Sequence, residues 1–308
     1  ESVKQGAKWR KESVYLGAAV PDEDHLRTLF GQFEARMAKK GVRSITPPYT
    51  QFITRTVARR LEKAIRQKKD YIHSLSESQR TSFIKRERIT FITASNAIDG
   101  STLDYGLTER VISDQKRIDN FQKRGIIVTG MGHGEQEALN LNKCLDIYEK
   151  MQAGRAEINE EMILRLHYTL LSKIEGYGRY QGIWRPVNVM IHGSDHVFPH
   201  HSQVPELMDE LIKWYAKNKG LIHPAELAAK FHTRFTGIHP FADGNGRMAR
   251  LLMDYILQTN GFPFTNIPLK RRSAYMKTQA AGNHQDLKPF TLFLSEEIAK
   301  QCRRLKRK

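Results

Sequence analysis

Nine consecutive residues, His239 to Arg247, combine side chains that could bind phosphate and move a proton. Glycines at positions 244 and 246 permit backbone conformations that expose successive N–H groups, and such a turn at a helix start binds anions. Arg247 and Arg250 are three residues apart, so on a helix they share one face and can reach the same phosphates. The spacing therefore predicts a phosphate-binding turn.

Two further side chains add chemistry to this turn. Asp243 is an unfavourable neighbour for phosphate unless a cation lies between them, and Mg²⁺ held by one carboxylate and phosphate oxygens meets that need. His239 is the group of the stretch suited to taking a proton near neutral pH. We therefore expect a site that binds a metal-chelated polyphosphate and deprotonates an attacking hydroxyl. The alternative is a Gly-Asn turn between two core helices, because short glycine patterns recur by chance.

The flanking sequence predicts a helix on each side of the turn. Apolar residues at helical spacing precede it, at Leu227, Phe231 and Phe235, and Pro240 disfavours helical geometry at His239. An apolar face then resumes after the turn, so a second helix is expected from about Asn245 or Gly246 to about Gly261. The residues of that face are Met248, Leu251, Leu252, Tyr255 and Ile256.

The segment from His239 to Arg250 resembles the Fic-domain signature His-Pro-Phe-x-Asp/Glu-Gly-Asn-Gly-Arg-x-x-Arg at every fixed position. The resemblance implies an all-α Fic-fold enzyme that transfers AMP from ATP to Ser, Thr or Tyr hydroxyls of a protein target. It assigns His239 as the general base and Asp243 as the Mg²⁺ ligand. The implied nucleotide-binding residues are Gly244, Asn245 and Gly246 around the α-phosphate, Arg247 and Arg250 at the β- and γ-phosphates, and Asn283 with Tyr275 at the adenosine.

A second informative stretch contains Ser95, Asp99 and Gly100. Taken alone, it is a helix end stopped by Gly100, where an acid is mildly unfavourable. It is similar to the Fic inhibitory motif Ser/Thr-x-x-x-Glu-Gly/Asn, whose glutamate pairs with the second signature arginine and blocks the γ-phosphate position. Here the acid is an aspartate, one methylene shorter, so the implied pair with Arg250 requires a closer helix. Removal of AMP, which the glutamate supports in some relatives, stays open as an alternative activity.

Residues 187–192 alternate branched apolar residues with others, and Gly193-Ser194-Asp195 follows as a turn. This period-2 pattern predicts a small β-hairpin. From Gly182 onward the segment resembles the Fic flap, which lies over the active site and pairs with the target peptide. The resemblance makes Val187, Val189 and Ile191 the expected docking residues, since an exposed strand edge can bind an extended segment.

Helical patterns account for the remaining chain, with an expected basic helical extension over residues 1–90, a Fic domain over 91–300 and a basic tail over 301–308. The pattern predicts one helix that begins at Pro21 and ends at Gly41. It predicts a second helix whose apolar face is formed by Ile53, Val57, Leu61 and Ile65. A third should follow the capping pair Ser76 and Gln79. The 103–126 pattern is helical but interrupted, and helices are predicted near 135–152, 158–173, 204–217, around Tyr275, and after Pro289. His167 shares the apolar face of the 158–173 helix and is expected to be a core histidine.

Composition limits the partners and the compartment. The net charge is +17 over 308 residues; residues 1–90 hold 20 Lys/Arg against 10 Asp/Glu, and the last eight add five more basic residues. Such flanks could meet nucleic acid or an acidic partner, which leaves a Fic-fold binding module as the competing function, and a homodimer is also open. No run is long enough for a membrane span. Two cysteines, Cys144 and Cys302, favour a cytoplasmic or other reducing compartment.

Overall fold

The computed structural model of the chain describes residues 2–5, 8–11, 28, 29, 32, 35, 36, 50–126, 131–154, 156–191 and 196–303. The chain forms two compact units, one comprising Thr50–Lys219 with Pro224–Lys308 and the other Glu1–Tyr49 with Gly220–His223. In the latter, β1 (Ser2–Gln5) and β2 (Lys8–Lys11) pair antiparallel, with Ser2 opposite Lys11. Most of the predicted helix between Pro21 and Gly41 lies outside the described residues.

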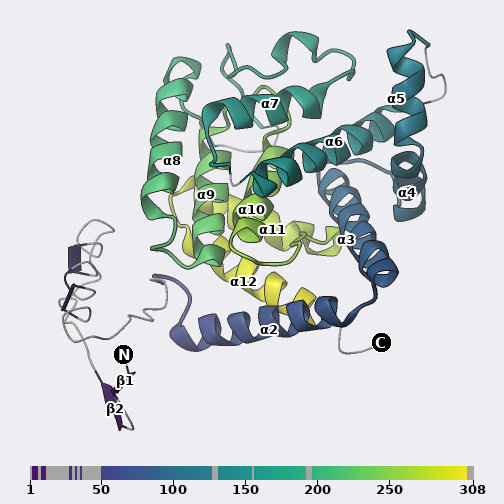
Figure 1. Ribbon diagram of the computed structural model, residues 1–308. Coiled ribbons are helices and arrows are strands. Elements are labelled where there is room, and N and C mark those ends of the chain that lie inside the picture. The colour runs from purple at the N-terminus through teal and green to yellow at the C-terminus, as the bar shows by residue number, and fades with distance from the viewer. Residues whose placement is uncertain are drawn as a thin grey trace. The chain divides into compact units, whose positions relative to one another are not determined.

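The larger unit is built around two helices, α9 (Pro224–Ile238) and α10 (Asn245–Thr259), which pack against each other at its centre (Figure 1). Almost every side chain of α10 is buried, as expected for a helix surrounded by other helices. Its buried apolar residues are Met248, Ala249, Leu251, Leu252, Met253, Tyr255, Ile256 and Leu257. The candidate turn therefore joins the two most central helices, which fixes its ends in the core.

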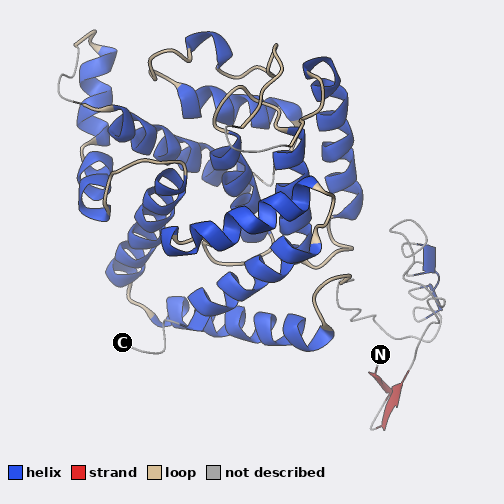
Figure 2. Ribbon diagram, turned by 180° about the vertical axis from the view of Figure 1, so that it is seen from behind, coloured by secondary structure: helices blue, strands red, loops and turns tan. Residues whose placement is uncertain are grey.

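Nine more α-helices surround this pair in the described residues. They are α2 (Arg55–Ser74), α3 (Glu77–Ile98), α4 (Tyr105–Ser113), α5 (Gln115–Lys123), α6 (His133–Ala153), α7 (Glu160–Leu171), α8 (Val204–Asn218), α11 (Arg272–Asn283) and α12 (Lys288–Arg303). Helices α8, α11 and α12 pack on α9, whereas α3 and α6 contact α10, and α2 lies along α12. Helices form nearly all the regular structure (Figure 2), which confirms the all-α prediction.

No helix in the part of the chain that the structure describes is long and apolar enough to cross a membrane.

Helix α3 positions the second candidate stretch. Its start is capped as predicted, since the Ser76 hydroxyl accepts from Gln79 N and the Gln79 side chain accepts from Ser76 N. Halfway along, Arg88 reaches α6, donating from Nε to Asn142 Oδ1 at 2.6 Å and pairing through Nη1 with Glu149 at 2.8 Å. At its end Gly100 adopts a left-handed φ of +106°, which favours glycine and stops the helix.

The predicted hairpin is not formed in the described residues. Residues 187–191 carry no strand, whereas residue 192 and the expected turn at 193–195 lie outside the described chain. Side chains hold this segment instead of a strand ladder: Arg185 Nη1 donates to Val187 O at 3.0 Å, and Asn188 Oδ1 accepts from His201 N at 2.8 Å. The period-2 pattern thus marks an exposed loop, in which Met190 is 80% accessible.

Both cysteines are buried free thiols. Cys302, expected in the basic tail, belongs to α12 and is 4% exposed. Helix α12 therefore extends to Arg303 and carries the first residues of the segment expected as a tail.

Candidate active site

His239 follows the last residue of α9 in a strained backbone conformation. Its φ is +53°, uncommon for any residue other than glycine. Its N–H still donates to Phe235 O at 3.0 Å, whereas its carbonyl leaves the helix and accepts from Arg185 Nε at 2.8 Å. The backbone N–H of Arg185 also donates to Pro240 O at 2.9 Å. Arg185, which is 2% exposed, therefore fixes the point where the chain turns out of α9.

The imidazole of His239 is neutral at physiological pH. Its pKa is lowered to about 4, mainly by burial and also by Arg185 and His196, against an opposing contribution from the backbone of Thr236. The ring of Phe198 lies against it, with centroids 4.2 Å apart. A neutral imidazole at this position can accept a proton from an approaching hydroxyl.

The turn itself is braced from inside by Asn245. Its Oδ1 accepts from Phe241 N at 2.9 Å and its Nδ2 donates to Phe241 O at 2.8 Å. Gly244 adopts φ +77° as the N-cap of α10, and a Cβ there would lie 3.2 Å from Leu170 Cδ2. Glycine is thus favoured at this position by its positive φ, and any side chain there would have to displace the end of Leu170.

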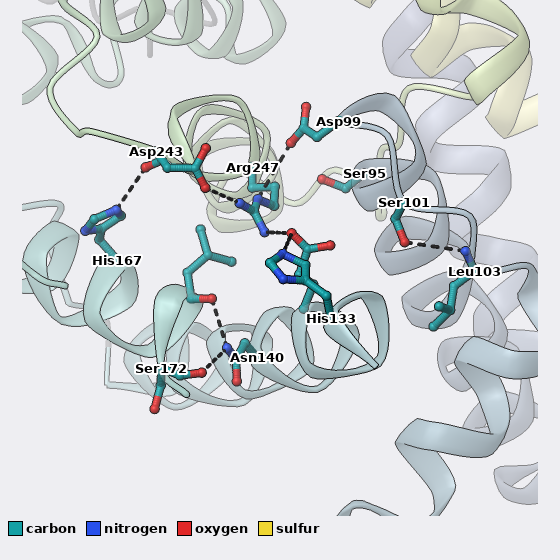
Figure 3. Close-up of polar contacts among 12 residues, drawn as sticks. Ser95, Asp99, Ser101, Leu103, His133, Asn140, His167, Ser172, Asp243 and Arg247 are labelled. Atoms are coloured by element: carbon teal, nitrogen blue, oxygen red, sulfur yellow. Dashed lines mark hydrogen bonds and ion pairs between the residues drawn. The ribbon is translucent and has the colours of Figure 1, made fainter. Parts of the chain in front are cut away.

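His167 supports the turn from α7 (Figure 3). Its Nε2 donates to Asp243 O at 3.1 Å, its Nδ1 accepts from Gly182 N at 3.1 Å, and its ring stacks on Phe241 at 3.5 Å. Burial lowers its pKa to about 4, so the ring is neutral. The expectation of a core histidine is confirmed, and this histidine also links the turn to the residues that precede the loop at 187–191.

Arg250 is buried, and the end of α3 supplies three of its contacts. Its Nε donates to Ser95 Oγ and its Nη2 to Ser95 O, both at 2.9 Å, and Nη2 also pairs with Asp99 Oδ2 at 2.7 Å. The shorter acid reaches the arginine because α10 has no side chain at position 246. A Cβ at Gly246 would lie 3.2 Å from Asp99 Oδ1 and 3.1 Å from Arg250 Nη1.

Arg247 lies among three carboxylates that come from three different elements (Figure 3). Its Nη1 pairs with Glu137 Oε1 of α6 at 2.6 Å, its Nη2 with Asp243 Oδ2 at 2.8 Å, and its Nε lies 3.7 Å from Asp99 Oδ2. The arginine is 4% exposed. Five charged side chains, three acidic and two basic, thus converge at the start of α10.

The carboxylate of Asp243 suits a metal ion whose remaining ligands are phosphate oxygens and waters. The side chain of Asp243 is 39% exposed at the turn, whereas no group of three or more His, Cys, Asp or Glu among the described residues could hold an ion. A single accessible carboxylate suits Mg²⁺, which keeps waters and phosphate oxygens as its other ligands.

The expected adenosine residues differ in their surroundings. Tyr275 is 2% exposed, and its hydroxyl contacts His232 Nε2 at 3.0 Å and the Arg250 guanidinium. It therefore supports the arginine from α11. Asn283 is the last residue of α11 and half-buried, and that helix packs on α9.

Sequence reasoning missed two residues of this site. Glu137 lies 110 residues before the arginine that it pairs with, and Arg185 lies 54 residues before His239. The first contact depends on how α6 packs against α10 and the second on how the loop at Arg185 lies against the end of α9, and no local pattern marks either role. Arg185 also connects the site to the expected docking segment, because its Nη1 donates to Val187 O. In that segment Val187 and Ile191 are exposed and Val189 is half-buried.

Comparisons with known proteins agree with this arrangement. Residues 157–257 match the Fic/DOC family. The chain is similar to the protein adenylyltransferase Fic of Nematostella vectensis, with 30% identity over 214 residues, which are 69% of this chain and 47% of that protein. The protein of the same name from Drosophila persimilis is 27% identical over 253 residues, covering 80% of this chain and 47% of that one. The chain thus spans about half the length of these curated relatives.

Solved structures show the same fold. A Fic family protein from Desulfovibrio desulfuricans G20 aligns with a TM-score of 0.66 and 28% identity, over 85% of this chain and 76% of that one. Fic-1 from C. elegans, residues 134–508, aligns with a TM-score of 0.65 and 22% identity, over 92% and 77%. The family match across the turn, the helical fold and these likenesses together identify residues 157–257 as a Fic/DOC domain.

Proposed function

We propose that the protein is an adenylyltransferase that moves AMP from Mg²⁺-bound ATP to a Ser, Thr or Tyr hydroxyl of a protein. The observation that carries the proposal is the neutral imidazole of His239 beside a turn from which two buried arginines, Arg247 and Arg250, project. The names of the relatives from Nematostella and Drosophila support the same reaction.

In the proposed reaction the hydroxyl oxygen of the target attacks the α-phosphorus of ATP. The new O–P bond forms as the bond to the bridging oxygen of the β-phosphate breaks, and pyrophosphate leaves. His239 takes the hydroxyl proton at its imidazole. The N–H groups of the turn stabilise charge on the α-phosphate, while Arg247 and Arg250 hold the phosphates beyond it. Mg²⁺, when bound at Asp243, would neutralise phosphate charge.

We also propose that the end of α3 restrains this reaction. Asp99 and Ser95 together use the Nε and Nη2 donors of Arg250, which the nucleotide would need. A polyphosphate must displace this buried pair or bind without that arginine. The target would approach over residues 187–191, whose exposed apolar side chains follow directly from the Arg185 anchor.

The test uses ATP labelled in the α-phosphate with the Asp99→Gly variant. Covalent transfer of labelled AMP to the chain itself or to a lysate protein, lost in Asp99→Gly/His239→Ala, is the expected result. Release of AMP from a modified protein would indicate the reverse reaction, and transfer of another labelled group would refute the adenylate assignment. Absence of any transfer from Asp99→Gly would sink the enzyme proposal and leave a binding module.

A further inference from the structure

The three carboxylates around Arg247 are not equivalent. Asp243 and Asp99 have side chains that are 39% and 34% exposed, whereas that of Glu137 is 14% exposed. Asp243 can therefore turn towards solvent or a metal ion, and Asp99 can move away together with the end of α3. Glu137 remains the one acid placed on the protected side of the guanidinium.

Glu137 is also held by a firmly packed element. Gly134, in the first turn of α6, lies so close to the segment after α3 that a Cβ there would be 2.8 Å from Leu103 Cδ1 and 3.0 Å from Ser101 Oγ. His133 Nε2 lies 3.5 Å from Glu137 Oε1 (Figure 3). The start of α6 thus fixes where the Glu137 carboxylate can be.

The remaining donors of Arg247 define what such an anchor does. Its Nη2 bonds Asp243, and its Nε makes no hydrogen bond among the described residues although it is buried. A guanidinium is planar, so a carboxylate that holds Nη1 sets the plane in which Nη2 and Nε point. An arginine oriented in advance loses less freedom when a phosphate binds.

We infer that Glu137 is a positioning residue for nucleotide recognition: it holds Arg247 through Nη1 and so presents Nη2 and Nε to the phosphates beyond the α-phosphate. The inference rests on the proposed function, which places those phosphates at Arg247. Glu137 itself touches neither nucleotide nor target. This positioning role distinguishes Glu137 from Asp99, which is proposed to oppose nucleotide binding.

Loss of Glu137 should weaken the binding of ATP and not that of AMP, because AMP lacks the phosphates that Arg247 is proposed to hold. Dissociation constants for Mg²⁺-ATP and for AMP are measured by calorimetric titration of Asp99→Gly and Asp99→Gly/Glu137→Ala. We expect the ATP constant to rise roughly tenfold in the double variant and the AMP constant to change less than about twofold.

Two further variants control the interpretation. Glu137→Gln keeps an oxygen that can accept from Nη1 and should fall between the parent and the alanine variant. Glu149→Ala removes an acid of the same helix that pairs with Arg88 at 2.8 Å, far along α6 from the turn. Glu149→Ala should leave the ratio of the ATP and AMP dissociation constants unchanged. If the effect of Glu137→Ala came from a general loosening of α6, both Glu137→Ala and Glu149→Ala would change that ratio.

Several outcomes would overturn the inference. Tighter ATP binding in Glu137→Ala would mean that the acid competes with phosphate, and equal weakening of ATP and AMP would mean that it serves stability alone. If Glu137→Ala does not fold, an unchanged ATP to AMP ratio in Glu137→Gln is sufficient to reject it. An Asp99→Gly parent that binds neither nucleotide refutes the proposed function as well, whereas a parent that binds and transfers AMP with an unchanged ratio refutes the inference alone.

Discussion

The chemistry of single residues depends on how completely their neighbours exclude water. His239 is a neutral base because burial disfavours its charged form, and Arg185 adds a nearby positive charge. Arg185 also fixes the backbone of His239, because its Nε donates to the His239 carbonyl oxygen. One buried guanidinium therefore fixes the backbone of the proposed base and adds to the effect of burial that keeps its imidazole neutral.

This arrangement predicts the acid limb of the reaction. With a pKa of about 4, His239 is already deprotonated at pH 5.5, so the transfer rate of Asp99→Gly should fall less than twofold between pH 8 and pH 5.5. A histidine of ordinary pKa would lose roughly tenfold at pH 5.5. Initial rates at saturating ATP check this, with circular dichroism at each pH to confirm folding. A limb near pH 6.5 would contradict the buried geometry.

A second prediction concerns the backbone of the turn. Gly244→Ala should cost about 1–2 kcal/mol of unfolding free energy, because its φ is +77° and the new Cβ would crowd Leu170. ATP binding should weaken as the N–H groups move. The matched control is Gly237→Ala in α9, where a Cβ meets nothing within 4 Å, and it should stabilise by up to about 1 kcal/mol. Urea unfolding of both variants gives the comparison, and equal effects would argue against the strained turn.

At the scale of elements, α3 and α6 each bring an acid to a different arginine of α10. Asp99 at the end of α3 pairs with Arg250, and Glu137 of α6 pairs with Arg247. The Asp99 pair with Arg250 predicts that Asp99→Asn increases ATP affinity by roughly tenfold, since the charge that opposes phosphate is lost while the side-chain shape remains. Ser95→Ala should give a smaller gain. Fluorescence titration with an ATP analogue measures both.

The matched control for Asp99→Asn is Asp104→Asn. Asp104 lies five residues on and caps α4, where its Oδ1 accepts from Leu107 N at 2.8 Å, and asparagine caps equally well. Its replacement should leave ATP affinity unchanged. A similar gain in both variants would point to long-range charge and not to the contact with Arg250.

The elements were largely predictable and their contacts were not. The apolar spacing at Leu227, Phe231 and Phe235 placed α9, and the apolar face that begins at Met248 placed α10, because each signal is local. The capping pair of α3 was equally readable. The alternation at residues 187–191 was misleading, since a strand requires a partner that the local pattern does not supply. Glu137 and Arg185 were missed because their roles arise from packing between distant segments.

At the scale of the whole molecule, buried neutral histidines make stability depend on pH. Burial lowers the pKa of His167 to about 4, below its usual value near 6.5, so the unfolded chain binds its proton first as pH falls. Stability from this residue is therefore present above pH 6.5 and lost as pH falls towards 4.

His167 alone should lower the unfolding free energy by about 2 kcal/mol between pH 7 and pH 5. Urea unfolding of the full chain at the two pH values measures the loss. His167→Gln should be less stable at pH 7, because its contacts with Asp243 and Gly182 are disturbed, and should show a smaller difference between the two pH values. An undiminished difference would assign the pH dependence to other groups.

The continuity of α3 has a mechanical consequence. This helix of 22 residues spans about 33 Å without a break, from the Ser76 cap to the acid at Arg250. Near the midpoint of α3, Arg88 attaches the helix to Asn142 and Glu149 of α6. A displacement of the helix near Ser76, on the side where Glu87 pairs with Lys68 of α2, would be transmitted along the same helix to Asp99. The proposed catalytic turn would in this way respond to an event on a surface with which it makes no contact.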